Sequence, residues 1–126
     1  MRGFQVLLLA GLLTTQGCVL QAVTPLGTAE KTYIQDYDAV AAALQKALTT
    51  LDIKIGDTKR KEENGKIVAT EIQAYVRDLT ITISIDRISD KATRVIVDAS
   101  NKYLLKDTTT AGEILDQTTK NLAKTS

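Results

Sequence analysis

Residues 53–76, IKIGDTKRKEENGKIVATEIQAYV, constrain the fold more than any other part of the chain. At their centre is Asn64-Gly65, and both of these residue types tolerate the positive φ angles of a two-residue hairpin turn. The turn predicts an antiparallel hairpin in which the numbers of facing residues sum to ~129, with one face that is apolar at its base and polar toward its tip. The predicted facing pairs are Ile53 with Val76, Ile55 with Ala74, Asp57 with Ile72, and Lys59 with Thr70.

The next two stretches extend the same apolar face. Residues 79–86, LTITISID, alternate between apolar and polar. If Arg77 and Asp78 form a tight turn, the same face stays apolar across it; because this pair is not a favoured turn dipeptide, a longer turn remains open. A looser loop over residues 87–93 then leads to a strand, RVIVDAS. The predicted facing pairs are Val76 with Leu79, Ala74 with Ile81, Ile72 with Ile83, Val95 with Ile85, Val97 with Ile83, and Ala99 with Ile81.

A strand over residues 30–34 and two helices complete the pattern. Asp36 is a suitable N-cap for the first helix, whose apolar stripe Tyr37 can extend, and Thr110 and Glu113 form a capping box for the second. The apolar stripe of the first helix is Val40, Leu44, Ala47, Leu48 and Leu51, and that of the second is Ala111, Ile114, Leu115, Thr118 and Leu122. The order β-α-β-β-β-β-α predicts an α+β fold, an antiparallel sheet of four to five strands with two helices packed on one face.

The composition excludes much of the usual chemistry. The chain of 126 residues has room for one domain, and it has no histidine and one cysteine. It therefore lacks the commonest general acid/base and the means to form an internal disulfide or a thiolate metal cluster. Ser84, Ser89 and Ser100 have no histidine to activate them, and pairing with Lys91 or Lys102 has no specific support. We expect no enzyme activity, no cofactor and no metal site.

The net charge and the spacing of the acidic residues argue against a nucleic-acid partner and against a calcium site. The 16 basic residues, less Arg2 of the N-terminal segment, leave 15 against 15 acidic ones, so we expect no nucleic-acid partner. Asp36 and Asp38 are close together, but helix capping explains them better than calcium binding does. The run of charges in residues 59–63 is either a solvated hairpin tip or a docking site for a partner or a lipid headgroup.

The first 17 residues, MRGFQVLLLAGLLTTQG, predict a cleaved signal peptide. One arginine precedes an apolar run over residues 4–13, followed by small and polar residues. As a helix the run rises only ~15 Å, about half the thickness of the hydrocarbon layer, which disfavours a permanent span. A buried core helix is the alternative, but the remaining chain offers too little to surround it.

Cys18 follows directly. The tetrapeptide Thr15-Gln16-Gly17-Cys18 resembles the lipobox of bacterial lipoproteins, with Thr15 and Gln16 at less usual places and Gly17 as the small residue before the cut. The resemblance implies that signal peptidase recognises Thr15, Gln16 and Gly17 and that the Cys18 thiol carries a diacylglycerol. The alternative is a free thiol. Residues 18–28, which include the only proline, then form a lipidated tether, and residues 29–126 form a single α+β domain.

The chain as a whole is similar to a group of small bacterial lipoproteins defined only as a domain of unknown function. The lipobox, the Pro/Gly tether, the helix beginning near DYDAVAAAL, the IKIGD hairpin and the closing EILDQ helix carry this resemblance. It implies export and fold, and no activity. Because Val19 rather than Asp follows the cysteine, enterobacteria-like sorting favours the periplasmic face of a Gram-negative outer membrane.

Two functions remain open for the domain. The first is an accessory or scaffold lipoprotein that contacts another envelope protein through the outer face of the sheet or an edge strand. The second is a carrier or sensor of a small apolar ligand held between helices and sheet. Compact Ala and Val side chains at many core positions favour solid packing, and thus the first.

Overall fold

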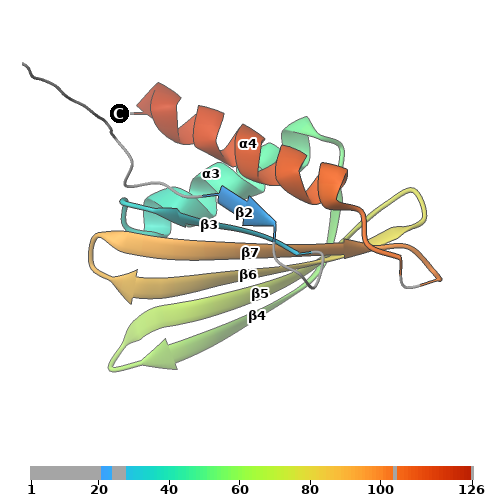
Figure 1. Ribbon diagram of the computed structural model, residues 1–126. Coiled ribbons are helices and arrows are strands. Elements are labelled where there is room, and N and C mark those ends of the chain that lie inside the picture. Colours follow the sequence, from blue (N-terminus) through green and yellow to red (C-terminus); the bar gives the residue numbers. More distant parts are fainter. Residues whose placement is uncertain (1–20, 24–27, 104, 126) are drawn as a thin grey trace, which may run out of the picture.

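The computed structural model describes residues 21–23, 28–103 and 105–125. Two helices cover one face of a six-stranded antiparallel sheet of order β2-β3-β7-β6-β5-β4 (Figure 1). The predicted α+β class and element order are confirmed, and β2 adds a short sixth strand. The elements are β2 Gln21–Val23, β3 Ala29–Tyr33, α3 Tyr37–Thr50, β4 Lys54–Glu63, β5 Lys66–Val76, β6 Leu79–Ser89, β7 Ala92–Ser100 and α4 Thr108–Thr125.

The centre of the sheet has the predicted register. Ile83 of β6 is opposite Ile72 of β5 on one side and Val97 of β7 on the other. The turn at Arg77 and Asp78 is tight, with Arg77 at a φ of 55°. The prediction of a loose loop over residues 87–93 is wrong, because β6 continues to Ser89 and β7 begins at Ala92. A bulge at Ile88 adjusts the two strands to the shorter turn.

The β4–β5 hairpin departs from the predicted register in its middle. Asn64 and Gly65 form the predicted turn with φ angles of 53° and 78°, and Ile55 pairs with Ala74 as expected. A bulge at Gly56 and a second at Val68 then shift the strands between them by one residue. The predicted pairs Asp57 with Ile72 and Lys59 with Thr70 are therefore wrong; the observed pairs are Asp57 with Gln73, Thr58 with Ile72, Lys59 with Glu71, and Arg60 with Thr70.

Both helices bury their predicted stripes except for Leu51, which follows α3 as its C-cap and is half-buried. The Oδ1 atom of Asp36 accepts a hydrogen bond of 2.8 Å from the backbone N–H of Ala39, which confirms the N-cap of α3. The predicted capping box of α4 is wrong: α4 begins at Thr108, and Asp107 accepts from the backbone N–H of Thr110 at 2.8 Å. The side-chain amide of Asn121 donates to the carbonyl oxygen of Ala43 and so ties α4 to α3.

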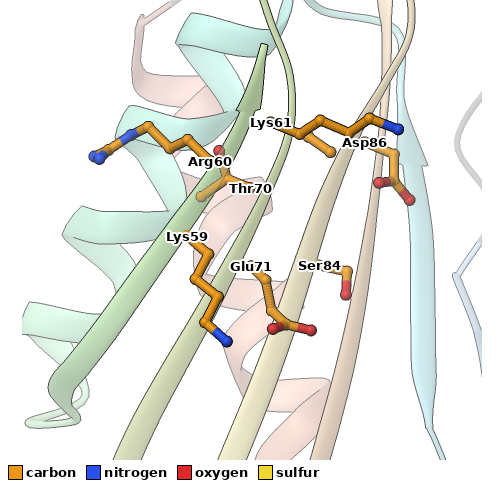
Figure 2. A pocket seen from close by; sticks show the side chains of 8 residues that line it. Lys59, Arg60, Lys61, Thr70, Glu71, Ser84 and Asp86 are labelled. Carbon is orange, nitrogen blue, oxygen red and sulfur yellow. The ribbon is translucent and has the colours of Figure 1, made fainter.

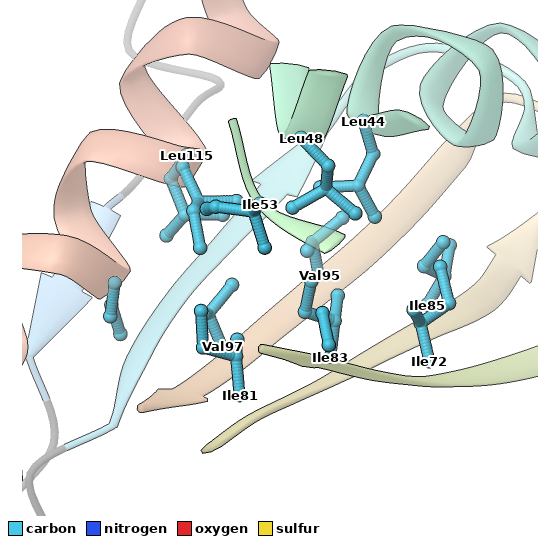
Figure 3. Close-up of a cluster of buried hydrophobic side chains, with 14 of the residues drawn as sticks. Leu44, Leu48, Ile53, Ile72, Ile81, Ile83, Ile85, Val95, Val97 and Leu115 are labelled. Carbon is cyan, nitrogen blue, oxygen red and sulfur yellow. The ribbon is translucent and has the colours of Figure 1, made fainter. Parts of the chain in front are cut away.

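The core lies between the helices and the sheet (Figure 3). Leu44 and Leu48 of α3 and Leu115 of α4 point toward the inner face of the strands. Fully buried side chains fill this layer from both sides: Leu44, Leu48, Ile72, Ile81, Ile83, Ile85, Val95, Val97, Ile114 and Leu115. Branched aliphatic residues thus form the interior of a domain that has few aromatic residues.

One edge of the sheet involves the segment before the domain. β3 pairs with β7, and β2 pairs with β3 through Gln21 with Lys31 and Val23 with Ala29. Three residues of the segment predicted as tether are therefore hydrogen-bonded to the domain. At the other edge of the described sheet, β4 is largely exposed along its length.

Candidate interaction surface

The residues of the predicted lipidation site lie outside the described part of the chain. These are Thr15, Gln16, Gly17 and Cys18, and the described structure begins at Gln21, three residues after the cysteine. Their processing stays a prediction.

Two of the residues considered for chemistry have structural partners. Asp36 caps α3, and the Ser89 side chain accepts a hydrogen bond from the backbone N–H of Lys91 within the β6–β7 turn. The described residues contain no group of three or more metal-ligating side chains. Ser84 lies on the outer face of the sheet, where it is the register partner of Glu71 of β5 (Figure 2).

The charged run of residues 59–63 borders a shallow groove of about 340 Å³ on the outer face. Lys59 and Lys61 extend over this face near Glu71 and Asp86, whereas Arg60 points away from them (Figure 2). The run lies in β4 rather than at an isolated tip, and all five side chains are exposed. The two lysines and the two carboxylates face one another across the groove, so it is a solvated surface with no strong preference for a ligand of either charge.

Three titratable residues are partly or fully buried against the helices. Burial raises the pKa of Tyr33 to about 12, and burial likewise raises the pKa of Tyr37. Burial lowers the pKa of Lys31, whose ammonium group donates to the Thr119 hydroxyl at 2.8 Å. The Tyr37 hydroxyl bonds that of Thr70. These groups join the sheet to its neighbours and face no open cavity, so we assign them a structural role.

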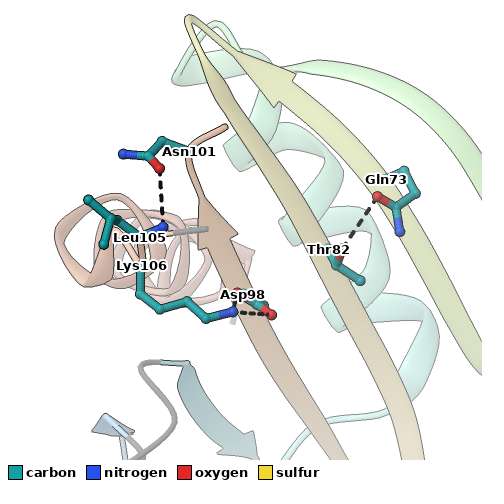
Figure 4. A network of polar contacts seen from close by, with 6 residues as sticks. All are labelled: Gln73, Thr82, Asp98, Asn101, Leu105 and Lys106. Atoms are coloured by element: carbon teal, nitrogen blue, oxygen red, sulfur yellow. Dashed lines mark hydrogen bonds and ion pairs between the residues drawn. The ribbon is translucent and has the colours of Figure 1, made fainter. Parts of the chain in front are cut away.

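The loop between β7 and α4, residues 101–107, is held by a dense set of hydrogen bonds (Figure 4). The Oδ1 atom of Asn101 accepts from the backbone N–H groups of Tyr103 and Leu105, at 2.9 and 3.1 Å. The backbone N–H of Asn101 donates to the carbonyl of Leu105, and Lys106 pairs with Asp98 at 2.7 Å. The described residues of this loop therefore have a defined conformation.

This ordered loop displays apolar side chains to solvent. Tyr103 is 71% exposed and Leu105 is 64% exposed, the largest values among the large hydrophobic side chains of the described chain. The ammonium group of Lys102 lies over the Tyr103 ring, 5.2 Å from its centre. The backbone of this loop is fixed by hydrogen bonds, and the loop exposes a tyrosine, a residue type that is enriched at interface hot spots. The leucine adds exposed apolar area beside it.

Other features at the same end of the sheet enlarge this surface. A concavity of about 430 Å³ lies between the loop and the turn at Arg77 and Asp78, and Leu105 lines it. Tyr75 and Ile55, at the nearby ends of β5 and β4, are also exposed, but they lie on opposite faces of the sheet, because Ile55 pairs with the buried Ala74 that precedes Tyr75. Sequence reasoning missed this surface; the signal was the apolar content of YLL within the polar segment NKYLLKD.

The helical layer has a separate concavity. Its volume is about 230 Å³, and Ala39, Ala42, Ala43, Lys46 and Asn121 line it. Three of these residues are exposed, so the space opens at the surface of α3 and is not between the helices and the sheet.

The comparisons with known proteins supply no relative. A scan against protein-family models and a search of curated proteins both found no match. Within the described residues, no helix has the length and apolarity needed to cross a membrane.

Proposed function

We propose that this protein is a lipid-anchored domain of the bacterial envelope that acts through protein–protein contacts as an accessory or scaffold lipoprotein. Its signal peptide is removed, Cys18 is acylated, and the domain faces the periplasm from the outer membrane. The loop of residues 101–107, with Tyr103 and Leu105, is the contact site for an envelope protein.

The support for the anchor comes from the sequence. A short apolar segment, a small residue and a single cysteine stand in the order that lipoprotein processing requires. Acylation explains both why the chain has a single cysteine and why that cysteine directly follows the apolar segment. Two or three acyl chains contribute about 0.8 kcal/mol per buried methylene group and so anchor a small domain stably.

The observation that supports the contact function is the fixed loop. Asn101 holds the backbone on both sides of the exposed Tyr103 side chain, so that little conformational entropy remains to be lost when a partner binds. The adjacent concavity of about 430 Å³ offers space for a side chain of the partner. The described residues contain a packed hydrophobic core and no metal-ligand cluster, so they offer no alternative site that is as well defined as this loop.

The anchor is tested by intact mass of the protein extracted in detergent from its own membranes. We expect a chain that begins at Cys18 and carries acyl chains, and a Cys18→Ala variant that lacks the acyl mass and leaves the membrane fraction. A native chain that still begins at Met1, or that carries a free thiol, contradicts the anchor.

The contact function is tested by a photo-crosslinking amino acid at position 103 in living cells. We expect an adduct of defined mass with one envelope protein. The same probe at Lys46, which is exposed on α3, is the matched control and should give no such adduct. An adduct that forms equally from both positions, or from neither, contradicts the proposed contact site.

The alternative function is a carrier or sensor of a small apolar ligand between helices and sheet. The packed side chains of this layer, with Leu44, Leu115 and Ile83 fully buried, favour the contact function. Stoichiometric binding of a fluorescent fatty acid that is lost in an Ile83→Asn variant of unchanged fold would reverse this preference.

A further inference from the structure

The sheet has two ends that differ in what they carry. The turns at Asn64-Gly65 and at Asp90-Lys91 lie together at one end, which we call the hairpin end (left in Figure 1). An ion pair of 3.7 Å between Lys66 and Asp90 links the two turns. The turn at Arg77 and the loop of residues 101–107 lie at the opposite end, the loop end (right in Figure 1).

Chain length limits where an anchor on Cys18 can be. Cys18 is three residues before Gln21, so their α-carbons are at most about 11 Å apart. Gln21 is level with Lys31 in β3 and, through it, with Val95 in β7. The start of β7 is three residues from Val95, about 10 Å, whereas its end at Ser100 is five residues away, about 17 Å. Cys18 is therefore within reach of the hairpin end and cannot reach the loop end.

The direction of β2 points the same way. β2 is antiparallel to β3, so from Val23 back to Gln21 the chain runs in the direction in which β3 proceeds to Tyr33. Tyr33 is opposite Thr93, two residues from the β6–β7 turn. The strand pairing thus directs the anchor toward the hairpin end, and only three residues separate the acylated position from the folded domain.

The hairpin end carries two exposed isoleucines. Ile34 follows the last residue of β3 and is 51% exposed, and Ile88 is the bulge residue of β6 and is 52% exposed. Thr93 of β7 is opposite both Tyr33 and Arg87, so the two isoleucines flank the beginning of the same strand. Apolar side chains in this place fit the boundary between lipid headgroups and acyl chains.

The charges of the hairpin end nearly cancel. Around the two turns Lys61, Lys66 and Lys91 accompany Glu62, Glu63 and Asp90, and Arg87 and Asp38 lie beside Gly65 in one concavity at the same end. An end of this composition is neither repelled by anionic lipids nor held by them, so its contact with a bilayer depends on acyl chains and apolar side chains and is insensitive to salt.

We infer that the hairpin end rests on the membrane, with Ile34 and Ile88 at the lipid surface, and that the loop end points away from it. The inference rests on the proposed acylation of Cys18. β7, of nine residues, spans about 26 Å from one end to the other. The exposed Tyr103 and Leu105 are then held clear of the lipid, where a periplasmic partner can reach them.

The test uses the single cysteine. In the acylated protein the Cys18 thiol is blocked, so a cysteine introduced as Ile88→Cys or Leu105→Cys is the only one that a fluorophore can label. Both positions are exposed, and they lie at opposite ends of the sheet. Each full-length variant is purified from membranes, its acyl mass is measured, and it is labelled with an environment-sensitive dye and reconstituted in vesicles that contain a nitroxide lipid.

We expect the label at position 88 to be blue-shifted and quenched several-fold more than that at position 105, in low and in high salt. An acylated protein whose label at position 105 is quenched as strongly overturns the orientation and leaves the anchor standing. A protein without acyl chains overturns the anchor, and the orientation with it.

Discussion

The hydroxyl of Tyr33 donates to the backbone carbonyl oxygen of Leu115 over 3.0 Å and thereby joins β3 to α4. The hydroxyl of Thr119 is 3.1 Å from that of Tyr33, and the Lys31 ammonium group lies over the Tyr33 ring, 5.6 Å from its centre. Asp116 is close enough to oppose ionisation of the Tyr33 hydroxyl and so to raise its pKa further. The tyrosine is buried, so its ionised form is disfavoured in the folded protein. The residue that joins the edge of the sheet to a helix therefore also makes the stability of the fold decrease with pH in the alkaline range.

Stability should fall as the pH rises above 10. The pKa of Tyr33 is about 12 in the folded state, against 10.0 for an unperturbed tyrosine. Between these values the unfolded chain loses the proton first, so the free energy of unfolding decreases, by up to about 2 to 3 kcal/mol at the upper limit. Urea unfolding at pH 8, 10 and 11, followed by circular dichroism in detergent, measures this slope.

A Tyr33→Phe variant separates this residue from the other titrating groups. At pH 8 we expect a loss of about 0.5 to 1.5 kcal/mol, because the hydrogen bond is gone while Thr119 still donates to Leu115. Its decline above pH 10 should be shallower than that of the wild type, since only Tyr37 still destabilises there and Lys31 acts in the opposite direction. An unchanged slope would show that Tyr33 does not control it.

Truncation of one central isoleucine should cost far more than truncation of an exposed one. Ile83 is fully buried between Ile72 and Val97 in the middle of the sheet. Ile83→Ala should lower the free energy of unfolding by about 2 to 5 kcal/mol, through lost transfer energy and the cavity left behind. Ile88→Ala on the same strand is the control, with an expected loss below about 1 kcal/mol in detergent. Equal losses would contradict the described core.

The register of the inner strands could be predicted because each strand buries one face. A slip by one residue between β5, β6 and β7 would bring Ile81, Ile83 and Ile85 to the solvent face, so alternation alone selects the pairing. On β4 this constraint is absent. It is an exposed edge strand, and bulges at Gly56 and Val68 shift its middle without exposing a core residue.

The start of α4 was mispredicted because a contact with β7 determines it. Thr110 and Glu113 match the capping-box spacing, but the loop before the helix returns to β7 through a hydrogen bond from the backbone N–H of Asp107 to Ala99. This contact places Asp107 at the cap position, and Thr110 becomes a buried residue of the first turn. Pattern matching does not contain such tertiary contacts.

Substitution at this cap distinguishes the two assignments. Asp107→Ala should cost about 0.5 to 2 kcal/mol, because the backbone N–H of Thr110 loses its acceptor. Glu113→Ala, at an exposed position, should stay within about 0.5 kcal/mol of the wild type. Thermal unfolding of both variants measures the difference, and a larger effect at Glu113 would restore the capping box.

The candidate contact surface had a weaker signature in the sequence than the core had. Tyr103 and Leu105 form no periodic pattern with their neighbours, so nothing in the sequence shows that they are exposed. Their exposure is seen only in the structure, where the Asn101 side chain accepts hydrogen bonds from the backbone N–H groups of both residues. The lipidation motif, by contrast, is local and can be read directly from residues 15–18.

The role of Asn101 can be tested without knowledge of the partner. In Asn101→Ala the backbone N–H groups of Tyr103 and Leu105 lose a side-chain acceptor, but both are near solvent, so we expect a loss below about 1 kcal/mol in global stability. Amide hydrogen exchange at Leu105 should accelerate many-fold, while exchange in β6 and β7 stays unchanged. Asn101→Asp keeps an oxygen acceptor at the same place and should retain slow exchange.

The same two variants test the contact site. Because a loosened loop loses more conformational entropy when a partner binds, the photo-crosslink from position 103 should weaken in the alanine variant and persist in the aspartate variant. A crosslink that survives equally in both would show that the fixed loop is not what the partner recognises.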